Sequence, residues 1–432
     1  MDNSDRAISV DVLSAWVRDA RARTLGLVAD LDDEQLMGPR LPIVNPLLWE
    51  IAHATWFQER WVLQYAGHKN PIDAEGSRLF DSIAIDHEVR HDLPLPSRES
   101  TFSYLEQVRD AVVELLEQGE LTDELIYFVK LSVFHEDMHT EAITYTRQTL
   151  AYPAPAFDAE PYDPIAEPDA DRMSADVEQP GGMLEVGAAR DAVFVFDSEK
   201  WAHPVRVEPF SIATTAVSQG QFAAFVDDGG YRRPELWSEE GWRWRTQGGA
   251  RHPVYWKHDG GWLRRHFDEW RPLEPQLAVI HVNWFEADAY CRWAGRRLPV
   301  EAEWELAASS ISVKRHYPWG EVTPAAAHAN LDWQAMGPVT TTAHAAGDCL
   351  CGCRQMIGNV WEWTATTFHP YPGFAADPYK EYSRPCFGKC KVLRGGCWAT
   401  RSRLMRNTWR NFYRPDRRDV FAGFRTCACC DP

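Results

Sequence analysis

A proline-rich and acidic segment, residues 151–180, constrains the fold of this 432-residue chain more than any other feature. Its prolines are Pro153, Pro155, Pro161, Pro164, Pro168 and Pro180, and acidic residues surround them with almost no apolar periodicity. Because proline lacks an amide donor and has a fixed φ angle, such a segment cannot continue a helix or a central strand. We therefore interpret 151–180 as a linker and expect two domains with separate cores, residues 1–150 and 181–432.

Residues 1–150 carry the spacing of amphipathic helices. The first helix begins near Asp11 and places on one face Leu13, Val17, Ala20, Thr24, Val28 and Leu31. Asn45 and Pro46 predict the start of a second helix, with asparagine as the cap and proline at the first helical position. A third runs through Tyr104 to Gly119, which we expect to form a left-handed C-cap, and a fourth begins after Thr122. This pattern predicts a four-helix bundle.

The pattern changes after Gly181. Short apolar runs alternate with glycine, proline and asparagine, and tryptophan is scattered throughout. Only residues 219–227 and 284–293 have the periodicity of helices. This half therefore predicts an irregular α+β domain with long loops, and the whole chain is expected to be an α+β multidomain protein.

The composition excludes several classes of function. A net charge of −18 disfavours binding to a nucleic-acid backbone, which requires a basic surface. No stretch is apolar enough for a membrane helix, and the first residues lack a basic start and an apolar signal core. We therefore expect a cytoplasmic protein that acts on small molecules, without a nucleic-acid or membrane partner.

Three histidines have a spacing that suits a metal ion. His135 and His139 are four residues apart on the fourth helix, so that both project from one face and can chelate a single ion. Their stripe contains Phe128, Leu131, His135, His139 and Ala142, which directs both rings toward the bundle core. The second helix has a matching stripe of Trp49, His53, Trp56 and Arg60. His53 should therefore reach the same interior. Taken singly, each histidine could instead be a core residue bonded to a backbone carbonyl, and the spacing alone fits zinc as well as iron.

Cysteine is concentrated at the C-terminal end of the chain. Nine of the ten cysteines follow residue 340, namely Cys349, Cys351, Cys353, Cys386, Cys390, Cys397, Cys427, Cys429 and Cys430. Three interpretations stay open: buried apolar filler, a structural zinc site that joins residues 349–353 to the tail, or soft ligands for copper or selenium. The last two would give the chain a second metal site in addition to the histidines.

Several segments together resemble the ergothioneine sulfoxide synthase family. In the first half these are NPLLWEIAH (residues 45–53) and HEDMH (135–139), which resemble the DinB-type bundle of that family. In the second half they are FVDDGGY (225–231), RLPVEAEWE (297–305), GNVWEWT (358–364) and VLRGGCW (392–398). These resemble the family's domain of the formylglycine-generating-enzyme type, which has a C-type-lectin-like core. The resemblance covers nearly the whole chain, in the same order.

The resemblance implies a nonheme iron(II) enzyme that uses dioxygen and acts on hercynine, the trimethylated betaine of histidine. His53, His135 and His139 would hold the iron, and Met138 would lie in the substrate pocket. Three neutral ligands leave the ion its full positive charge and leave positions open for an imidazole nitrogen, a thiolate or selenolate, and dioxygen.

Residues of the second half also match positions of the family. Tyr379 matches the active-site tyrosine that is proposed to pass a proton during oxygen activation. Asn411 and Phe412 match the loop that holds hercynine, where an aromatic face suits a quaternary ammonium. Arg417 and Arg418 match positions that contact carboxylates. Without the resemblance, Tyr379 would be a surface tyrosine and the arginines a solvated basic run.

Two departures from the family pattern concern the donor of sulfur or selenium. Where mycobacterial-type members that use γ-glutamylcysteine carry a pair of arginines, this chain has His87 and Arg90, and it has Tyr413 in place of an acidic residue. These changes remove partners for the carboxylate and amine of a dipeptide. We therefore expect a selenosugar donor, as in the selenoneine synthase branch, with cysteine or γ-glutamylcysteine as the alternative.

Three rival functions are possible on the same residues. Zinc-dependent thiol transferases share the bundle but lack a second domain. A formylglycine-generating activity needs a pair of cysteines in the second domain and leaves the three histidines unexplained. A lectin-like binding module predicts no metal. Metal analysis of the purified protein separates these alternatives.

Overall fold

The computed structural model describes residues 8–157, 175–310 and 314–429, and the chain divides into two compact units, residues 1–158 and 159–432. Each unit is described here by itself. Among the described residues, no helix has the length and apolar character that a membrane span requires.

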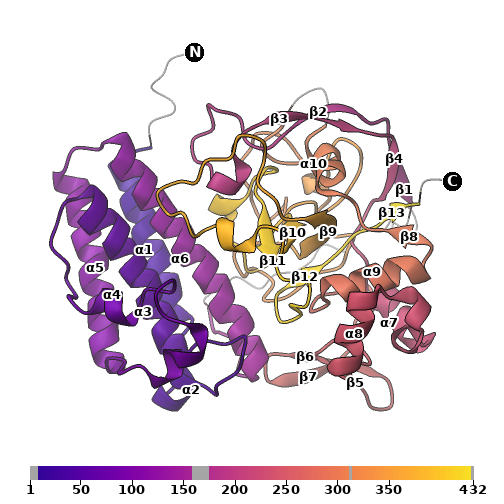
Figure 1. Cartoon of the computed structure of the whole chain (residues 1–432), viewed down its shortest axis with the longest axis horizontal. Coiled ribbons are helices and arrows are strands. Elements are labelled where there is room, and N and C mark those ends of the chain that lie inside the picture. Colours follow the sequence, from indigo (N-terminus) through magenta and orange to yellow (C-terminus); the bar gives the residue numbers. More distant parts are fainter. Residues whose placement is uncertain (1–7, 158–174, 311–313, 430–432) are drawn as a thin grey trace. The chain divides into compact units, whose positions relative to one another are not determined.

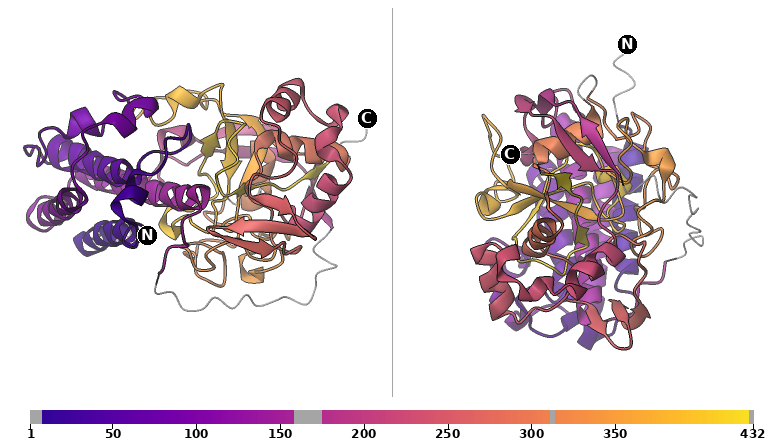
Figure 2. Two further views of the ribbon diagram at one scale, coloured as in Figure 1. Left: turned by 90° about the horizontal axis from the view of Figure 1, so that it is seen from below. Right: turned by 90° about the vertical axis from the view of Figure 1, so that its right-hand side faces the viewer.

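The first unit is helical. Its elements are α1 (Val10–Gly26), α2 (Asp33–Met37), α3 (Leu47–Gln58), the π-helix η2 (Glu59–Ala66), α4 (Gly76–Leu79), the 3₁₀ helix η3 (His87–Asp92), α5 (Arg98–Gln118) and α6 (Asp123–Leu150). The long helices α1, α3, α5 and α6 run side by side as a bundle (Figures 1 and 2), and η2 continues α3. The core of the bundle includes the whole stripe predicted for the first helix, although Val28 and Leu31 follow the end of α1.

The ends of these helices agree only partly with the sequence prediction. Thr122 caps α6 as expected, since its side chain accepts a hydrogen bond from the amide of Leu125. The prediction for Asn45 was wrong, because Pro46 occupies the N-cap position of α3 and Asn45 donates to Glu50 instead. The left-handed cap predicted at Gly119 was also wrong: its φ and ψ are −91° and 168°. Glycine suits this position because a Cβ atom would lie 2.5 Å from a carbonyl oxygen of the last turn of α5.

A buried ion pair joins α1 to α6 inside the bundle. Arg21 and Glu136 are both fully buried, with Nε of Arg21 2.8 Å from Oε1 of Glu136. Thr24 donates to the same oxygen at 2.8 Å, and Arg21 also donates to Gln58 and to the carbonyl oxygen of Leu105. Since a buried charge is tolerated only when it is paired and hydrogen-bonded, this network fixes α6 relative to its neighbours.

The second unit combines short helices and small sheets. Its main helices are α7 (Gln219–Asp227), α8 (Glu239–Gln247), α9 (Trp284–Trp293) and α10 (Glu301–Ser309). Its strands are β1 (Asp176–Gln179), β2 (Gly182–Val186), β3 (His203–Val207), β4 (Phe210–Ala213), β5 (Trp256–His258), β6 (Trp262–His266), β7 (Glu269–Pro272), β8 (Arg296–Arg297), β9 (Trp361–Thr367), β10 (Lys391–Arg394), β11 (Asn411–Tyr413), β12 (Ala422–Gly423) and β13 (Cys427–Ala428). The helices predicted at 219–227 and 284–293 are confirmed as α7 and α9, whereas α8 and α10 were missed because short helices carry a weak periodic signal.

Within the described residues, the strands form four separate sheets. Their orders are β1-β4-β13-β8, β11-β10-β9-β12, β2-β3 and β5-β6-β7, and every pairing is antiparallel except β9 with β12. Strand β1 lies within the predicted linker 151–180, so the predicted linker extends too far toward the C-terminus. Strand β1 pairs with β4, with Asp176 opposite Ala213 and Gln179 opposite Phe210. The sequence of residues 176–179 does not reveal that β4 is the partner strand. Residues 158–174 of the predicted linker lie outside the described part of the chain.

The signature segments of the second unit contribute residues to its buried ion pairs. Arg394 is fully buried and pairs with Glu301 at 3.1 Å and Glu305 at 2.5 Å, both on α10. Arg425 is also fully buried and pairs with Glu362 of β9 at 2.7 Å. Arg394 therefore joins β10 to α10, and Glu362 joins β9 to the residues between β12 and β13.

Candidate metal centre

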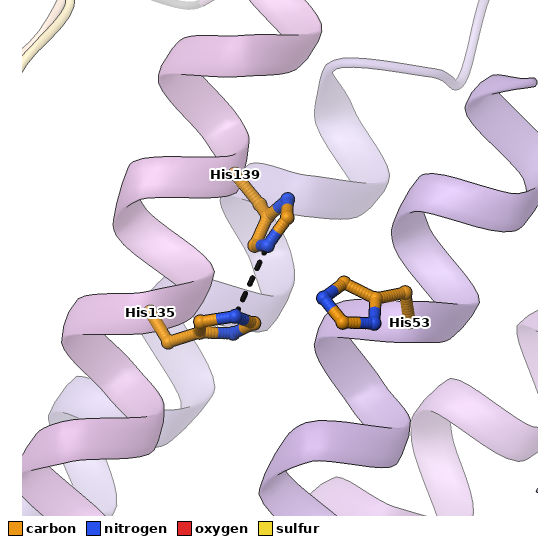
Figure 3. Close-up of side chains that lie close together, drawn as sticks. All are labelled: His53, His135 and His139. Atoms are coloured by element: carbon orange, nitrogen blue, oxygen red, sulfur yellow. Dashed lines mark hydrogen bonds between the residues drawn. The ribbon is translucent and has the colours of Figure 1, made fainter. Parts of the chain in front are cut away.

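The structure brings the three predicted histidines together inside the first unit (Figure 3). His53 projects from α3, and His135 and His139 project from successive turns of α6. Nε2 of His135 and Nε2 of His139 are 3.1 Å apart, and one ring nitrogen from each histidine lies within 4.8 Å of the others. His53 and His135 are buried, and His139 is partly exposed. One ion could therefore be reached by all three rings.

Hydrogen bonds outside the cluster fix the orientation of two rings. Nδ1 of His53 lies 2.7 Å from the carbonyl oxygen of Phe80, to which it must donate. Nδ1 of His139 lies 2.6 Å from Oε1 of Glu50. Because each Nδ1 carries the proton in these contacts, the Nε2 lone pair of each ring is left for a metal ion.

Aromatic side chains hold the rings from the sides. The ring of Trp49 stacks on His53 with centroids 4.8 Å apart, and the ring of Phe57 stacks on His135 at 3.7 Å. Trp49 and Phe57 lie on α3 and are buried. These contacts restrict ring rotation and limit the access of water to the buried part of the cluster.

A chain of polar side chains extends from the cluster through Glu50. Nδ2 of Asn45 donates to Oε2 of Glu50 at 2.7 Å, and Nη1 of Arg90 donates to Oδ1 of Asn45 at 3.0 Å. The guanidinium of Arg90 also lies 4.0 Å from the centroid of Trp49 and donates to the carbonyl oxygens of residues 82 and 85. Arg90, predicted to contact a donor, is thus part of the wall that supports Glu50.

The electrostatics of the cluster favour neutral imidazoles. Burial, together with the nearby His139, lowers the pKa of His53 to about 3 and lowers the pKa of His135 well below its ordinary value. Burial raises the pKa of Glu50, but its contact with His139 outweighs this effect and brings the pKa to about 2. Near neutral pH, His53 and His135 thus present lone pairs beside an ionised carboxylate. This donor set fits a divalent transition-metal ion such as iron(II) or zinc(II), with coordination positions left open.

Glu50, Asn45 and Phe80 were not among the predicted site residues. Glu50 has a sequence signal that could have identified it, because it is the acidic residue of the apolar helix α3 and lies three positions before His53. The carbonyl oxygen of Phe80 has no such signal, since any residue at that position supplies the same group.

In the second unit, Tyr379 lies on a bend between β9 and β10 and is half-buried. The centroid of its ring is 6.4 Å from that of Tyr382, and its carbonyl oxygen accepts from the amide of Tyr382. Two residues before it, Asp377 pairs with Lys200. The bend is thus anchored on both sides of the tyrosine.

The residues predicted to form a hercynine-binding loop belong to strand β11, which pairs with β10, so the prediction of a loop was wrong. Oδ1 of Asn411 accepts from the amide of Phe412 at 2.8 Å. The ring of Phe412 stacks on Phe368 with centroids 4.1 Å apart. Tyr413 follows, half-buried, with the guanidinium of Arg417 5.4 Å from its ring centroid.

The predicted arginines have carboxylate partners within the second unit. Arg417 pairs with Asp419 at 2.7 Å, and Arg418 pairs with the fully buried Glu286 at 2.5 Å. Arg418 also donates to the carbonyl oxygen of His252. The Arg418–Glu286 pair holds the segment after β11 against α9, whereas the Arg417–Asp419 pair lies within that segment.

Two predicted residues of the first unit remain. His87 is half-buried at the start of η3, and Met138 is partly exposed on α6 between the two histidines of that helix. Met138 therefore lies beside the cluster in sequence, whereas His87 lies on the segment that also carries Arg90.

Both halves of the chain match known protein families. The DinB superfamily matches residues 17–143, and the sulfatase-modifying factor enzyme 1-like domain matches residues 163–429, which confirms the predicted combination of folds. Hercynine oxygenase of Mycolicibacterium thermoresistibile is 37% identical, over 96% of this chain and 94% of that protein. Hercynine oxygenase of Mycobacterium tuberculosis is also 37% identical, over 96% of this chain and 98% of its own length. Formylglycine-generating enzyme of Streptomyces coelicolor is 34% identical, over only 65% of this chain and 96% of its own length. Because similarity to the first two spans both units, the chain belongs to the hercynine oxygenase (ergothioneine sulfoxide synthase) family.

Proposed function

We propose that this protein is an iron(II)- and dioxygen-dependent enzyme that bonds selenium to the imidazole ring of hercynine, with a selenosugar as the donor. The observation that carries this proposal is the convergence of His53, His135 and His139 in a chain of the hercynine oxygenase family. Membership of the family supports hercynine as substrate, and the imidazole donor set fits iron(II).

The residues of the chain have separate tasks in this proposal. His53, His135 and His139 hold the ion, and Glu50 keeps His139 in the required tautomer. When bound, iron supplies adjacent open positions for the imidazole and the chalcogen donor and accepts dioxygen as the oxidant. The ring of Phe412 offers an aromatic face to the trimethylammonium group, which cannot donate hydrogen bonds.

The choice of donor rests on His87, Arg90 and Tyr413. A pocket for γ-glutamylcysteine must pair a carboxylate and an ammonium, and an unpaired buried partner costs about 1–3 kcal/mol or more. Arg90 already donates to Asn45 and to backbone carbonyls, so its guanidinium is committed within the bundle. Tyr413 offers a hydroxyl and a ring, which suit a sugar better than an amine. A selenol also has a lower pKa than a thiol, so at neutral pH it is already a selenolate that can bind a metal ion.

Aerobic competition assays test the donor. With hercynine and equal concentrations of a 1-selenosugar, cysteine and γ-glutamylcysteine, we expect the carbon–selenium product to predominate. The excess over the product from a thiol should be about tenfold or more for each 1.4 kcal/mol that the thiol donor loses because its charged groups have no partner in the pocket. If either thiol outcompetes the selenosugar, the protein is an ergothioneine-type synthase and our interpretation of these positions is wrong. If no donor reacts with hercynine, the proposed function itself fails.

Glu50→Gln is expected to weaken binding of Fe(II) by about 10- to 100-fold, because it removes the charge that fixes and polarises His139 while keeping the volume of the side chain. The dissociation constant for Fe(II) measured under anaerobic conditions gives the result. Glu88→Gln is a suitable control, since Glu88 is exposed and belongs to the same unit. An unchanged affinity in the Glu50 variant would remove this residue from the metal centre.

Tyr379→Phe keeps the aromatic ring and removes the hydroxyl that we propose as a proton donor during oxygen activation. We expect product formation to slow by about 10²-fold or more, the usual contribution of a positioned acid, and oxidation of the donor to increase. Single-turnover measurements of both products report this partition. Tyr65→Phe, at an exposed position of the first unit, is the control. A native rate in Tyr379→Phe contradicts the role.

A further inference from the structure

A second group of potential metal ligands lies in the second unit, in the loop with the sequence CLCGC at residues 349–353. The sulfur atoms of Cys349 and Cys351 are 3.0 Å apart, and those of Cys351 and Cys353 are 3.5 Å apart. All three sulfurs lie within 4.8 Å of one another. Cys349 and Cys353 are buried, and Cys351 is half-buried. The three sulfurs therefore face a common point.

The backbone of the loop produces this convergence. The amide of Cys349 donates to the carbonyl oxygen of Cys353, and the amide of Gly352 donates to that of Cys349, both at 3.0 Å. Gly352 has a φ of +92°, which L-residues with a side chain rarely adopt. This tightly bent backbone brings the side chains of residues 349, 351 and 353 to one side of the loop. The positions of the three sulfurs therefore depend on two backbone hydrogen bonds and on one glycine.

A backbone amide contacts one of the sulfurs directly. The amide of Cys353 donates to the sulfur of Cys349 at 3.2 Å, a contact that stabilises negative charge on sulfur. A cluster that served only as apolar filler would not direct its sulfurs toward one another and toward an amide.

The distances fit one ion and do not fit a disulfide. A disulfide bond is about 2.05 Å long, well below either sulfur separation. An ion bound at about 2.3 Å from each of two thiolates in tetrahedral geometry would separate the sulfurs by about 3.8 Å, within reach of the present arrangement. Within the described ranges, no fourth histidine, cysteine or carboxylate joins the group. The predicted connection to the tail is not formed there, since neither Cys427 nor Cys429 belongs to the group, and Cys430 lies outside the described residues.

We propose that Cys349, Cys351 and Cys353 bind one soft d¹⁰ metal ion, copper(I) or zinc(II), as thiolates. Soft thiolate ligands select these ions, whereas imidazoles also accept iron, so the two clusters can hold different metals in one chain. Cys349 and Cys353 belong to the buried cluster that contains Ile212 of β4 and Trp304 of α10. The bound ion would fasten the loop to these elements and stabilise the second unit without a part in the oxygen chemistry.

Metal titrations of the full-length protein test this proposal. Metal-free reduced protein is given Cu(I) or Zn(II) under anaerobic conditions in competition with a chromophoric chelator, and bound metal is counted after desalting. We expect His135→Ala, whose histidine centre has lost a ligand, to bind one equivalent of at least one of these ions, and the native chain to bind one equivalent more of that ion than Cys351→Ser does. The two arms distinguish copper from zinc. The melting temperature of the second unit should rise when the ion is bound.

Cys351→Ser is the decisive variant, because Cys351 is half-buried and its replacement leaves the buried cysteines in place. It should lose the tightly bound ion, with at least a 100-fold weaker affinity, and Cys351→Ala checks that the loss does not depend on the new hydroxyl. Cys386→Ser, at another half-buried cysteine of the same unit, should retain the ion. Equal binding by the native chain and by Cys351→Ser overturns the proposal. So does a Cys349–Cys351 disulfide found by mass spectrometry in the protein as isolated.

Discussion

His135→Ala is expected to reduce bound iron from about one equivalent to a trace and to reduce product formation to background. The remaining His53 and His139 come from different helices, so the chelate formed by two rings on α6 is lost. Metal analysis of protein reconstituted with Fe(II), together with the aerobic assay with hercynine, measures both effects. The ring of His135 is buried against Phe57, and its removal also leaves a cavity that costs about 2–5 kcal/mol.

A companion variant separates the loss of metal from this loss of packing. His135→Gln fills more of the space and should also lose iron, while the unfolding transition stays closer to that of the native chain. His91→Ala is the control, since His91 is a half-buried histidine of the same unit outside the cluster. Stoichiometric iron in either His135 variant would contradict the assignment of this residue as a ligand.

Arg21→Met is expected to destabilise the first unit by about 3–5 kcal/mol, because it leaves the carboxylate of Glu136 buried without its partner. Glu136 follows His135 directly, so the same change should loosen the metal centre. Hydrogen exchange resolved by mass spectrometry reports the free energy of opening of α6 without interference from the second unit. We expect the slowest amides of α6 to exchange faster by the corresponding factor, from about 10² to about 4 × 10³.

The double variant Arg21→Met with Glu136→Leu tests the physical reason. Replacing both charges with apolar side chains removes the unpaired carboxylate and should recover most of the stability lost in Arg21→Met. Arg18→Met is a suitable control, because Arg18 pairs with Glu117 at an exposed position of the same helix. Equal destabilisation by the single and double variants would show that the guanidinium acts mainly through its bonds to Leu105 and Gln58.

The helix caps and the end of the linker show which structural features can be predicted from local sequence and which cannot. Thr122 was predicted correctly because a cap depends on residues within one turn of the chain. Asn45 was not, because Glu50 and Arg90 compete for its side chain, and Arg90 is contributed by another segment. Strand β1 was assigned to the linker for a similar reason: its strand character comes from pairing with β4, more than thirty residues later.

The sequence by itself determined the two-part organisation, the helical first half and the placement of His53, His135 and His139 on inward stripes. These follow from periodicity and from the interruption by proline, both of which are local properties of the chain. Only the tertiary structure decided the Glu50–Asn45–Arg90 chain behind the histidines, the buried ion pairs and the meeting of three sulfurs in the 349–353 loop. Some of these contacts depend on the distance and burial of side chains that lie far apart in sequence, as Arg21 and Glu136 do. Others depend on the backbone conformation of a loop. Neither kind of contact leaves a periodic signal in the sequence.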